Sequence, residues 1–174
     1  MFLPHFPLPL RSWVAGLLLV AAAVPAAAAD IPWLSRAWQA DEGLPDNTVV
    51  GVAQTPDGFL WVGTQSGLAR FDGVRFTEYA PAVAAGVPTS LIQALLLDRR
   101  GRLWFAKGRG VLACLDGERL TALTTADGLP DLQAMVLAED RAGAIWISSA
   151  GGRVFGLHDG QIRAFGVEDG LSVA

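Results

Sequence analysis

Residues 58–73 read GFLWVGTQSGLARFDG, and weaker copies of this stretch begin at Gly101 and Gly143. In each copy a tryptophan stands three residues after the first glycine, as Trp61 does after Gly58. The three tryptophans, Trp61, Trp104 and Trp146, are therefore 43 and then 42 residues apart. A fixed period near forty with several matched positions indicates structural repeats, each of which buries its apolar face against the next.

Every unit opens with a turn rich in glycine and proline. These turns lie at residues 41–47, 86–90 and 127–131, and a fourth begins at 168–171. Proline cannot donate to a strand ladder and glycine permits positive φ, so the sequence predicts turns with no helix at these places.

Four short apolar segments follow each opening turn, separated by glycine turns such as Asp72-Gly73. Apolar runs split by a two-residue Asp-Gly turn predict β-hairpins. The predicted strands are 48–53, 60–62, 68–71 and 74–79 in the first unit, 91–97, 103–105, 111–115 and 119–123 in the second, and 133–138, 145–147, 154–157 and 162–165 in the third. A small residue two positions after each tryptophan, such as Gly63, predicts close approach of a neighbour.

The four predicted strands of each unit form an antiparallel meander. One meander cannot bury both of its faces alone, so the copies are expected to stack, and four strands at this period favour the blades of a propeller. The predicted fold is all-β, a partial β-propeller of about three four-stranded antiparallel blades after an N-terminal signal peptide. The expected boundaries are 1–29 for the signal peptide, 30–43 for a lone outer strand and lead-in turn, 44–86, 87–128 and 129–170 for the blades, and 171–174 for the start of another repeat. Residues 35–39 match the fourth-strand segments and can complete the final blade of a ring. Since closed propellers have four or more blades, the chain is expected to be a fragment or a natural truncation.

The N-terminus predicts export. Arg11 precedes an apolar run over residues 13–24, followed by Pro25 and then, just before Asp30, by Ala27-Ala28-Ala29. This order is typical of a secretory signal with a small-residue cleavage site. A retained N-terminal anchor is the alternative, because the apolar stretch up to Ala29 approaches the length of a membrane span.

Composition and isolated reactive residues argue against several kinds of function. The net charge of −4 offers no basic surface for nucleic acid. The single cysteine, Cys114, excludes an intramolecular disulfide and is interpreted as a small apolar strand residue rather than a reactive thiol. His158 is interpreted as an exposed turn residue rather than a metal or catalytic group. Turn capping is favoured over calcium loops or an Asp-box for Asp57, Asp98 and Asp140. An Asp-box needs Asp-x-Gly-x-x-Trp, whereas the intervals from acid to glycine here are one, three and three.

The stretches DGFLWVGT (57–64), GLARFDGVRF (67–76) and GLPDN (43–47) resemble the two-component regulator propeller repeats. That family's consensus contains D-G-x-L-W-x-G-T, then G-L-x-x-x-D-G-x-x-F, then G-L-P-x-N. The match spans roughly residues 35–171 and loosens in the second and third units, where GT becomes Ala106-Lys107 and Ser148-Ser149. The resemblance implies a periplasmic sensor propeller of a bacterial signalling protein whose parent carries a membrane helix and an output domain such as a histidine kinase or diguanylate cyclase.

Loops at one rim of the blades are the expected place for binding. The predicted ligand-facing residues are Asp46, Asn47, Gln65, Ser66, Lys107, Arg109 and Asp131, and the resemblance suggests a glycan or another small molecule. The other expected partners are the remaining blades and a membrane-bound output of the parent. No catalytic domain, cofactor or metal site is predicted, because the chain has no phosphate-binding glycine motif and no phosphorylatable histidine on a recognisable helix. The alternative function is an exported propeller enzyme, a saccharide lyase or hydrolase truncated before its active site.

Overall fold

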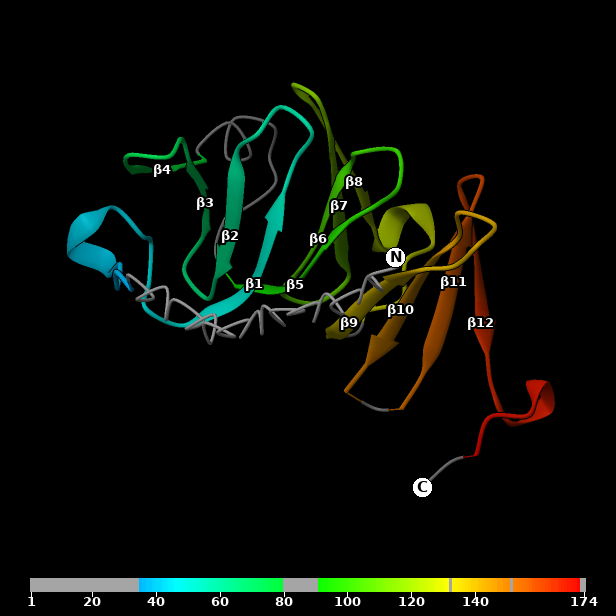
Figure 1. Ribbon diagram of the computed structural model, residues 1–174. Helices are drawn as coiled ribbons and strands as arrows, with labels where there is room; N and C mark the ends of the chain where they lie inside the picture. The colour runs from blue at the N-terminus through cyan, green and yellow to red at the C-terminus, as the bar shows by residue number, and fades with distance from the viewer. Residues whose placement is uncertain (1–34, 80–90, 132, 151, 173–174) are drawn as a thin grey trace, which may run out of the picture. The chain divides into compact units, whose positions relative to one another are not determined.

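The computed structural model describes residues 35–79, 91–131, 133–150 and 152–172 (Figure 1). The described strands all lie within Arg36–Ala174, the second of the two units into which the chain divides. The predicted signal peptide and the turn predicted at residues 86–90 lie outside the described residues.

The described strands form three four-stranded antiparallel sheets, each a meander of consecutive strands. This confirms the predicted all-β fold with its three blades. The first sheet contains β1 (Val49–Gln54), β2 (Leu60–Thr64), β3 (Leu68–Phe71) and β4 (Phe76–Glu78); the second contains β5 (Ile92–Leu97), β6 (Leu103–Lys107), β7 (Val111–Asp116) and β8 (Arg119–Thr124); the third contains β9 (Ala134–Glu139), β10 (Ile145–Ser149), β11 (Val154–His158) and β12 (Gln161–Phe165).

Strand β4 is shorter than the stretch predicted at residues 74–79. Val74 and Arg75 instead belong to the turn, because their backbone N–H groups donate to Asp72 Oδ1 over 2.8 and 2.9 Å. A carboxylate that accepts from the backbone two and three residues ahead stabilises a turn in place of a strand ladder.

The tryptophans of the first two blades occupy equivalent places in the core. Trp61 is buried in a cluster with Leu103 and Phe105 of the second sheet. Trp104 is buried in a cluster with Ile145 and Leu157 of the third sheet. Each of these tryptophans therefore packs against the sheet that follows it, which is the inter-blade arrangement that the repeat predicted.

Close packing between blades explains the small residue after the first tryptophan. A Cβ atom added at Gly63 would lie only 2.9 Å from Ile92 Cγ2 of the second sheet. Glycine is thus required here by the approach of the neighbouring blade, as the sequence predicted.

The opening turns contain single turns of 3₁₀ helix, contrary to the prediction of no helix. These are η1 (Ala40–Glu42), η2 (Thr125–Asp127) and η3 (Val167–Asp169). In each, the last carboxylate accepts the backbone N–H three residues earlier, over 3.3, 2.9 and 3.1 Å respectively. A glycine in the left-handed region then ends the turn. Acidic residues before the glycine thus close one helical turn, a capping pattern that the sequence reading missed.

The lead-in residues 36–39 have no strand pairing among the described residues, although their contacts match those of a fourth strand. Arg36 bonds to Glu42 over 3.0 Å and lies 3.6 Å above the Trp38 ring. Arg163, at the corresponding place in β12, bonds to Asp169 over 2.5 Å and lies 4.6 Å above an aromatic ring. The local turn is therefore the same in both places, while the hydrogen-bonded neighbour is present only for β12.

Candidate functional site

Each blade has two rims, which the antiparallel meander fixes. The turn before the first strand and the turn between the second and third strands lie at one end of the sheet, here called the loop rim. The turns between the first and second strands and between the third and fourth strands lie at the other end, here called the hairpin rim. The predicted ligand-facing residues belong to the loop rim: Asp46, Asn47, Gln65, Ser66, Lys107, Arg109 and Asp131.

Backbone hydrogen bonds join the loop rim from blade to blade. The residue after each second strand donates to the residue before the first strand, as Gly108 N does to Leu91 O over 3.1 Å. Leu91 N in turn donates to Gln65 O of the first blade over 2.5 Å. Arg109 forms an isolated antiparallel bridge with Gln133 at the start of the third blade. The backbone segments that carry the candidate residues are therefore hydrogen-bonded from the first blade to the second and from the second to the third.

Two pairs of candidate residues lie together. Ser66 Oγ donates to Asp46 Oδ2 over 3.2 Å, and Arg109 Nε donates to Asp131 Oδ1 over 3.2 Å. The backbone hydrogen bond from Thr48 is the main cause that holds the pKa of Asp46 below its usual value. Asp46 is therefore a carboxylate at neutral pH, with part of its acceptor capacity used inside the protein.

Asn47 and Gln65 differ in what holds them. Asn47 Oδ1 accepts the backbone N–H of Ala40 over 2.8 Å, so this amide supports the lead-in turn. The Gln65 side chain is exposed, and its residue is anchored by backbone bonds to Thr48 and Leu91. Of the two candidate amides, Gln65 is thus the one whose side chain is open to a ligand, while hydrogen bonds hold its backbone in place.

Lys107 does not face the solvent as expected. Its residue is 3% exposed, and its Nζ has no hydrogen-bond partner among the described residues. Burial lowers the pKa of Lys107 to about 8. The corresponding position of the first blade holds Thr64, whose hydroxyl closes the turn by bonding with Gly67 N and O over 3.0 and 2.9 Å. Lys107 has no hydroxyl to close its turn, and its ammonium is buried instead.

Leu91 is a loop-rim residue that the sequence reading placed in a strand. Its φ is +64° and its side chain is 56% exposed. Positive φ in a non-glycine residue is a strained conformation, and it is held here by the bonds of Leu91 to two blades. An apolar residue before a strand resembles a strand residue, so the local sequence contained no signal for this conformation.

Three side chains at the hairpin rim hold the repeat tryptophans. The residue six positions before each tryptophan accepts the indole N–H: Trp61 bonds to Thr55 over 2.9 Å, Trp104 to Asp98 over 2.8 Å, and Trp146 to Asp140 over 2.8 Å. Asp98 Oδ1 also accepts the N–H groups of Arg100 and Arg102. The turn-capping interpretation of Asp98 and Asp140 agrees with these contacts. Thr55 rather than Asp57 is their structural equivalent, which explains the differing spacing to glycine.

These contacts also set the pKa of the two carboxyl groups. Burial raises the pKa of Asp98, but hydrogen bonds from Trp104 and Arg102 outweigh it and leave the pKa below the ordinary value. The pKa of Asp140 is lowered first by the hydrogen bond from Trp146. Both groups are therefore ionised and structural rather than poised for proton transfer.

The reactive side chains singled out from the sequence have structural surroundings. Cys114 is buried in β7, and burial raises its thiol pKa to about 11, which suppresses the thiolate. His158 is exposed at the end of β11, with Nε2 3.5 Å from Asp159. Within the described ranges, no cluster of three or more histidine, cysteine or acidic residues is arranged to hold a metal ion.

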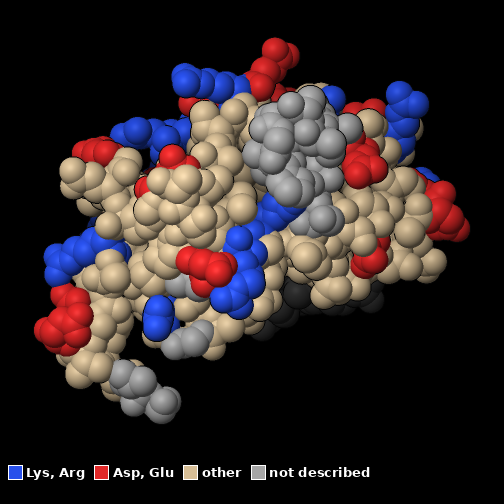
Figure 2. All heavy atoms as spheres, turned by 180° about the vertical axis from the view of Figure 1, so that it is seen from behind, with Lys and Arg blue, Asp and Glu red and all other residues tan. Residues whose placement is uncertain are grey.

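Acidic and basic residues are mixed on the surface. Figure 2 shows Lys and Arg atoms interspersed with Asp and Glu atoms on one face, without a field of one sign. The surface seen in this view has no extended basic patch of the kind that tracks a nucleic-acid backbone.

Four-stranded antiparallel meanders stacked face to face are the blades of a β-propeller. Residues 43–66 match the family model described as two component regulator propeller. This match covers the opening turn and the first two strands of the first blade, and it confirms there the resemblance seen in the sequence.

Solved structures share the fold at low sequence identity. The chain is similar to the extracellular domain of BT3049, described as a hybrid two component system of B. thetaiotaomicron, with a TM-score of 0.66 and 19% identity over 79% of this chain and 19% of that one. BT4673, from the same organism and described in the same way, gives a TM-score of 0.64 and 14% identity over 78% and 18% of the two chains. Virginiamycin B lyase from Staphylococcus aureus gives 0.54 and 19% identity over 68% and 41%.

These similarities extend over only part of the known structures. The chain spans about a fifth of the two extracellular domains and about two fifths of the lyase. No curated protein is similar in sequence. The structural similarity therefore establishes the propeller fold.

Proposed function

We propose that this propeller is the sensory input region of an exported two-component-type signalling protein, which reports ligand binding to an output elsewhere in its parent. The observation that carries the proposal is the two-component regulator repeat at residues 43–66, set in the first of three stacked blades. The extracellular domains of hybrid two component systems share this fold and support the same reading.

The loop rim is the proposed ligand surface. It offers an exposed amide at Gln65, a hydroxyl and carboxylate pair at Ser66 and Asp46, and the ion pair of Arg109 with Asp131. Such groups hydrogen-bond a polar neutral molecule, a description that fits a glycan or another small polyol. The backbone bonds between blades keep these groups in place before the ligand arrives, which reduces the entropy cost of binding.

We place the region in the periplasm, with the parent anchored in the inner membrane. The export pattern of residues 1–29 supports this location, as does the extracellular setting of the similar signalling domains. Among the described residues, no helix has the length and apolar character needed to cross a membrane. A fusion of residues 1–40 to alkaline phosphatase is expected to be active in the periplasm, and a fusion that remains inactive would contradict export.

An exported propeller enzyme is the second candidate. The lyase from Staphylococcus aureus supports it by fold alone. The reading frame beyond Ala174 separates the two candidates, since a membrane helix followed by a kinase or cyclase sequence supports the sensor. A ring that closes and ends with paired carboxyl groups about 5 to 10 Å apart would support a glycosidase instead.

The sensor proposal is tested in the full-length parent by a dose response. Gln65→Ala is expected to shift the response to higher inducer concentration, because it removes an exposed amide without touching the backbone bonds of the rim. Gln54→Ala, at the hairpin-rim end of β1, is the matched amide control and is expected to respond normally. Equal responses of wild type and Gln65→Ala would remove Gln65 from the site.

A further inference from the structure

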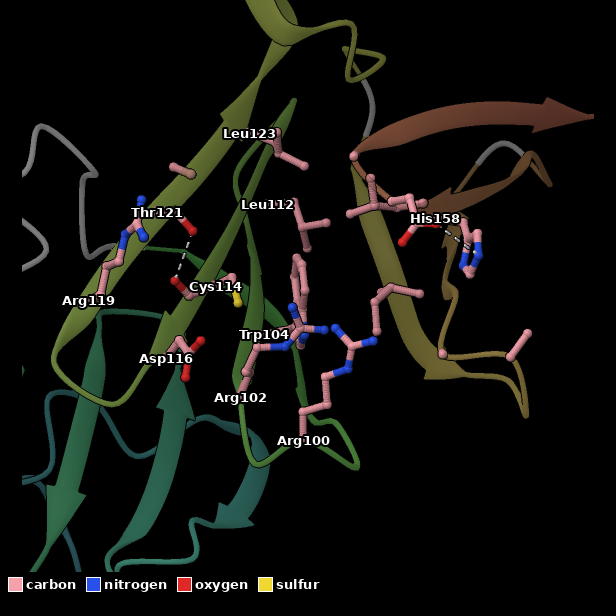
Figure 3. Close-up of a pocket in the computed structure, with 17 residues that line it drawn as sticks. Arg100, Arg102, Trp104, Leu112, Cys114, Asp116, Arg119, Thr121, Leu123 and His158 are labelled. Atoms are coloured by element: carbon pink, nitrogen blue, oxygen red, sulfur yellow. Dashed lines mark hydrogen bonds and ion pairs between the residues drawn. The ribbon is translucent and has the colours of Figure 1, made fainter.

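A cleft of about 320 Å³ lies between the second and third blades at the hairpin rim (Figure 3). Apolar side chains from facing sheets line it, Trp104, Leu112 and Leu123 on one side and Ile145 and Leu157 on the other, together with charged side chains such as those of Asp116, Arg119 and Asp159. The volume is at the lower end of the range for small-molecule sites, which are mostly apolar with a few polar groups.

Comparison of the repeats explains why a cleft is present here. Across the sheet, Trp61 stands beside Arg70, while Trp104 stands beside the much smaller Cys114. In the first blade the Tyr79 ring covers Trp61, with ring centroids 5.0 Å apart. The corresponding residue of the second blade is Leu123, which follows the paired Thr121 by two positions as Tyr79 follows Thr77.

The third blade follows the pattern of the first. Phe165 packs on Trp146 with centroids 4.8 Å apart. The second blade alone has an aliphatic residue at this position. Leu123 fills less space than an aromatic ring, so Trp104, although only 7% exposed, borders the cleft. A flat ring is the shape that the other two blades place there.

Charged groups stand at the mouth of the cleft. The Arg102 guanidinium is held by Asp98 over 2.6 Å and lies 5.1 Å from the Trp104 ring. Among the described residues, no ion pair or side-chain hydrogen bond holds the Arg100 guanidinium. Figure 3 shows Arg100 directed from the second blade toward the third, where His158 lies. Arg100 therefore offers N–H donors at the opening, unpaired within the described part of the chain, whereas His158 Nε2 lies 3.5 Å from Asp159.

We propose that this cleft binds a small molecule with one flat apolar ring and one carboxylate. The ring lies against Trp104 in the space that Tyr79 and Phe165 fill in the other blades, and the carboxylate accepts hydrogen bonds from Arg100. Asp116 and Asp159 also line the cleft and oppose a second negative charge. The site lies at the hairpin rim, so it is independent of the loop-rim function proposed above.

Phenylacetate tests the proposal, with phenylacetamide as its neutral counterpart. The chain has six tryptophans, and ¹⁵N labelling gives one indole signal for each, assigned by single Trp→Phe variants. The Trp104 signal is expected to shift and saturate at millimolar phenylacetate, as befits a ligand of few atoms. The Trp61 signal is expected to stay in place. Absence of a saturable Trp104 shift would overturn the proposal.

Three variants separate the ring site from the carboxylate site. Leu123→Phe fills the cleft with the ring found in the third blade and is expected to abolish the Trp104 shift with both probes, while its melting temperature shows that it folds. Arg100→Gln is expected to weaken phenylacetate about 5- to 10-fold and to leave phenylacetamide unchanged. Arg75→Gln, at the equivalent hairpin rim of the first blade, is the charge control. Undiminished binding by Leu123→Phe, or equal losses in Arg100→Gln and Arg75→Gln, would refute the assignment.

Discussion

Replacement of Lys107 by methionine is expected to stabilise the protein. Lys107 is the single lysine of the chain, its residue is 3% exposed, and its Nζ has no hydrogen-bond partner among the described residues. A buried ammonium without a partner costs free energy that a methionine of similar shape does not. Below pH 8 the folded chain bears this cost, and above pH 8 it releases the proton.

The magnitude follows from the pKa of Lys107. Burial lowers the pKa of Lys107 from 10.5 to about 8. Each pKa unit corresponds to a free-energy difference of about 1.36 kcal/mol between the charged and neutral forms. The upper limit of the penalty is thus about 3 kcal/mol. Water penetration and local relaxation reduce it, so about 1 to 2 kcal/mol is expected for Lys107→Met at pH 7.

The pH dependence has a definite sign. The folded pKa lies below the unfolded pKa, so between pH 8 and 10.5 the unfolded chain binds more protons and wild-type stability rises with pH. Lys107→Met lacks this contribution. Its advantage over wild type is therefore expected to shrink between pH 7 and pH 9.5.

Urea unfolding followed by tryptophan fluorescence measures both effects. Arg75→Met, which removes an exposed basic side chain, is the control and is expected to stay within about 0.5 kcal/mol of wild type. A Lys107→Met variant less stable than wild type at pH 7, or one whose advantage does not change with pH, would show that the ammonium has a compensating partner.

Two further changes test the turns. Asp98→Ala is expected to lower the free energy of unfolding by about 2 to 4 kcal/mol, because it leaves the Trp104 and Arg102 donors unpaired; Thr55→Ala, its counterpart in the first blade, is expected to cost about 1 kcal/mol. The lowered pKa of Asp98 adds stability above the unfolded pKa of about 3.8, which is lost as the pH falls through the folded value, so the difference between wild type and Asp98→Ala is expected to decrease below pH 4 in acid titrations. Gly110→Ala is expected to lower the free energy of unfolding by more than about 1 kcal/mol, because φ is +67° and the new Cβ would lie 2.6 Å from Thr125 Cγ2. Gly117→Ala is the control and is expected to cost less, because its φ is +57° and the space around it is open. Thermal melts that reverse this order would contradict the packing argument.

The sequence contained most of the strand order because its signals are local. Asp-Gly turns and apolar runs specify hairpins over a few residues, and the strands lie within a few residues of their predicted bounds. The sequence did not predict the 3₁₀ turns, because the glycine and proline residues there indicate turns without a helix. The helical turn depends instead on one hydrogen bond, from the backbone N–H to an acidic side chain three residues later.

The candidate site was predictable only in part. Its loops followed from the meander, since alternate turns of antiparallel strands must lie at the same end of a sheet. Whether a side chain in those loops reaches solvent depends on the neighbouring blade, and this separates exposed Gln65 from buried Lys107. Leu91 takes its left-handed conformation because residues of two blades bond to its backbone, contacts that no local pattern encodes.

The sequence by itself determined the repeat, the strands and the tryptophan in the second strand of each blade, because period and turn chemistry act over short distances along the chain. Only the tertiary structure decided which faces meet: that Trp61 is covered by its own tyrosine and the second sheet, and that Trp104 borders an open cleft. The physical reason is that packing between sheets joins residues some forty positions apart, and one change from an aromatic ring to Leu123 alters the space between two blades without altering the pattern of either.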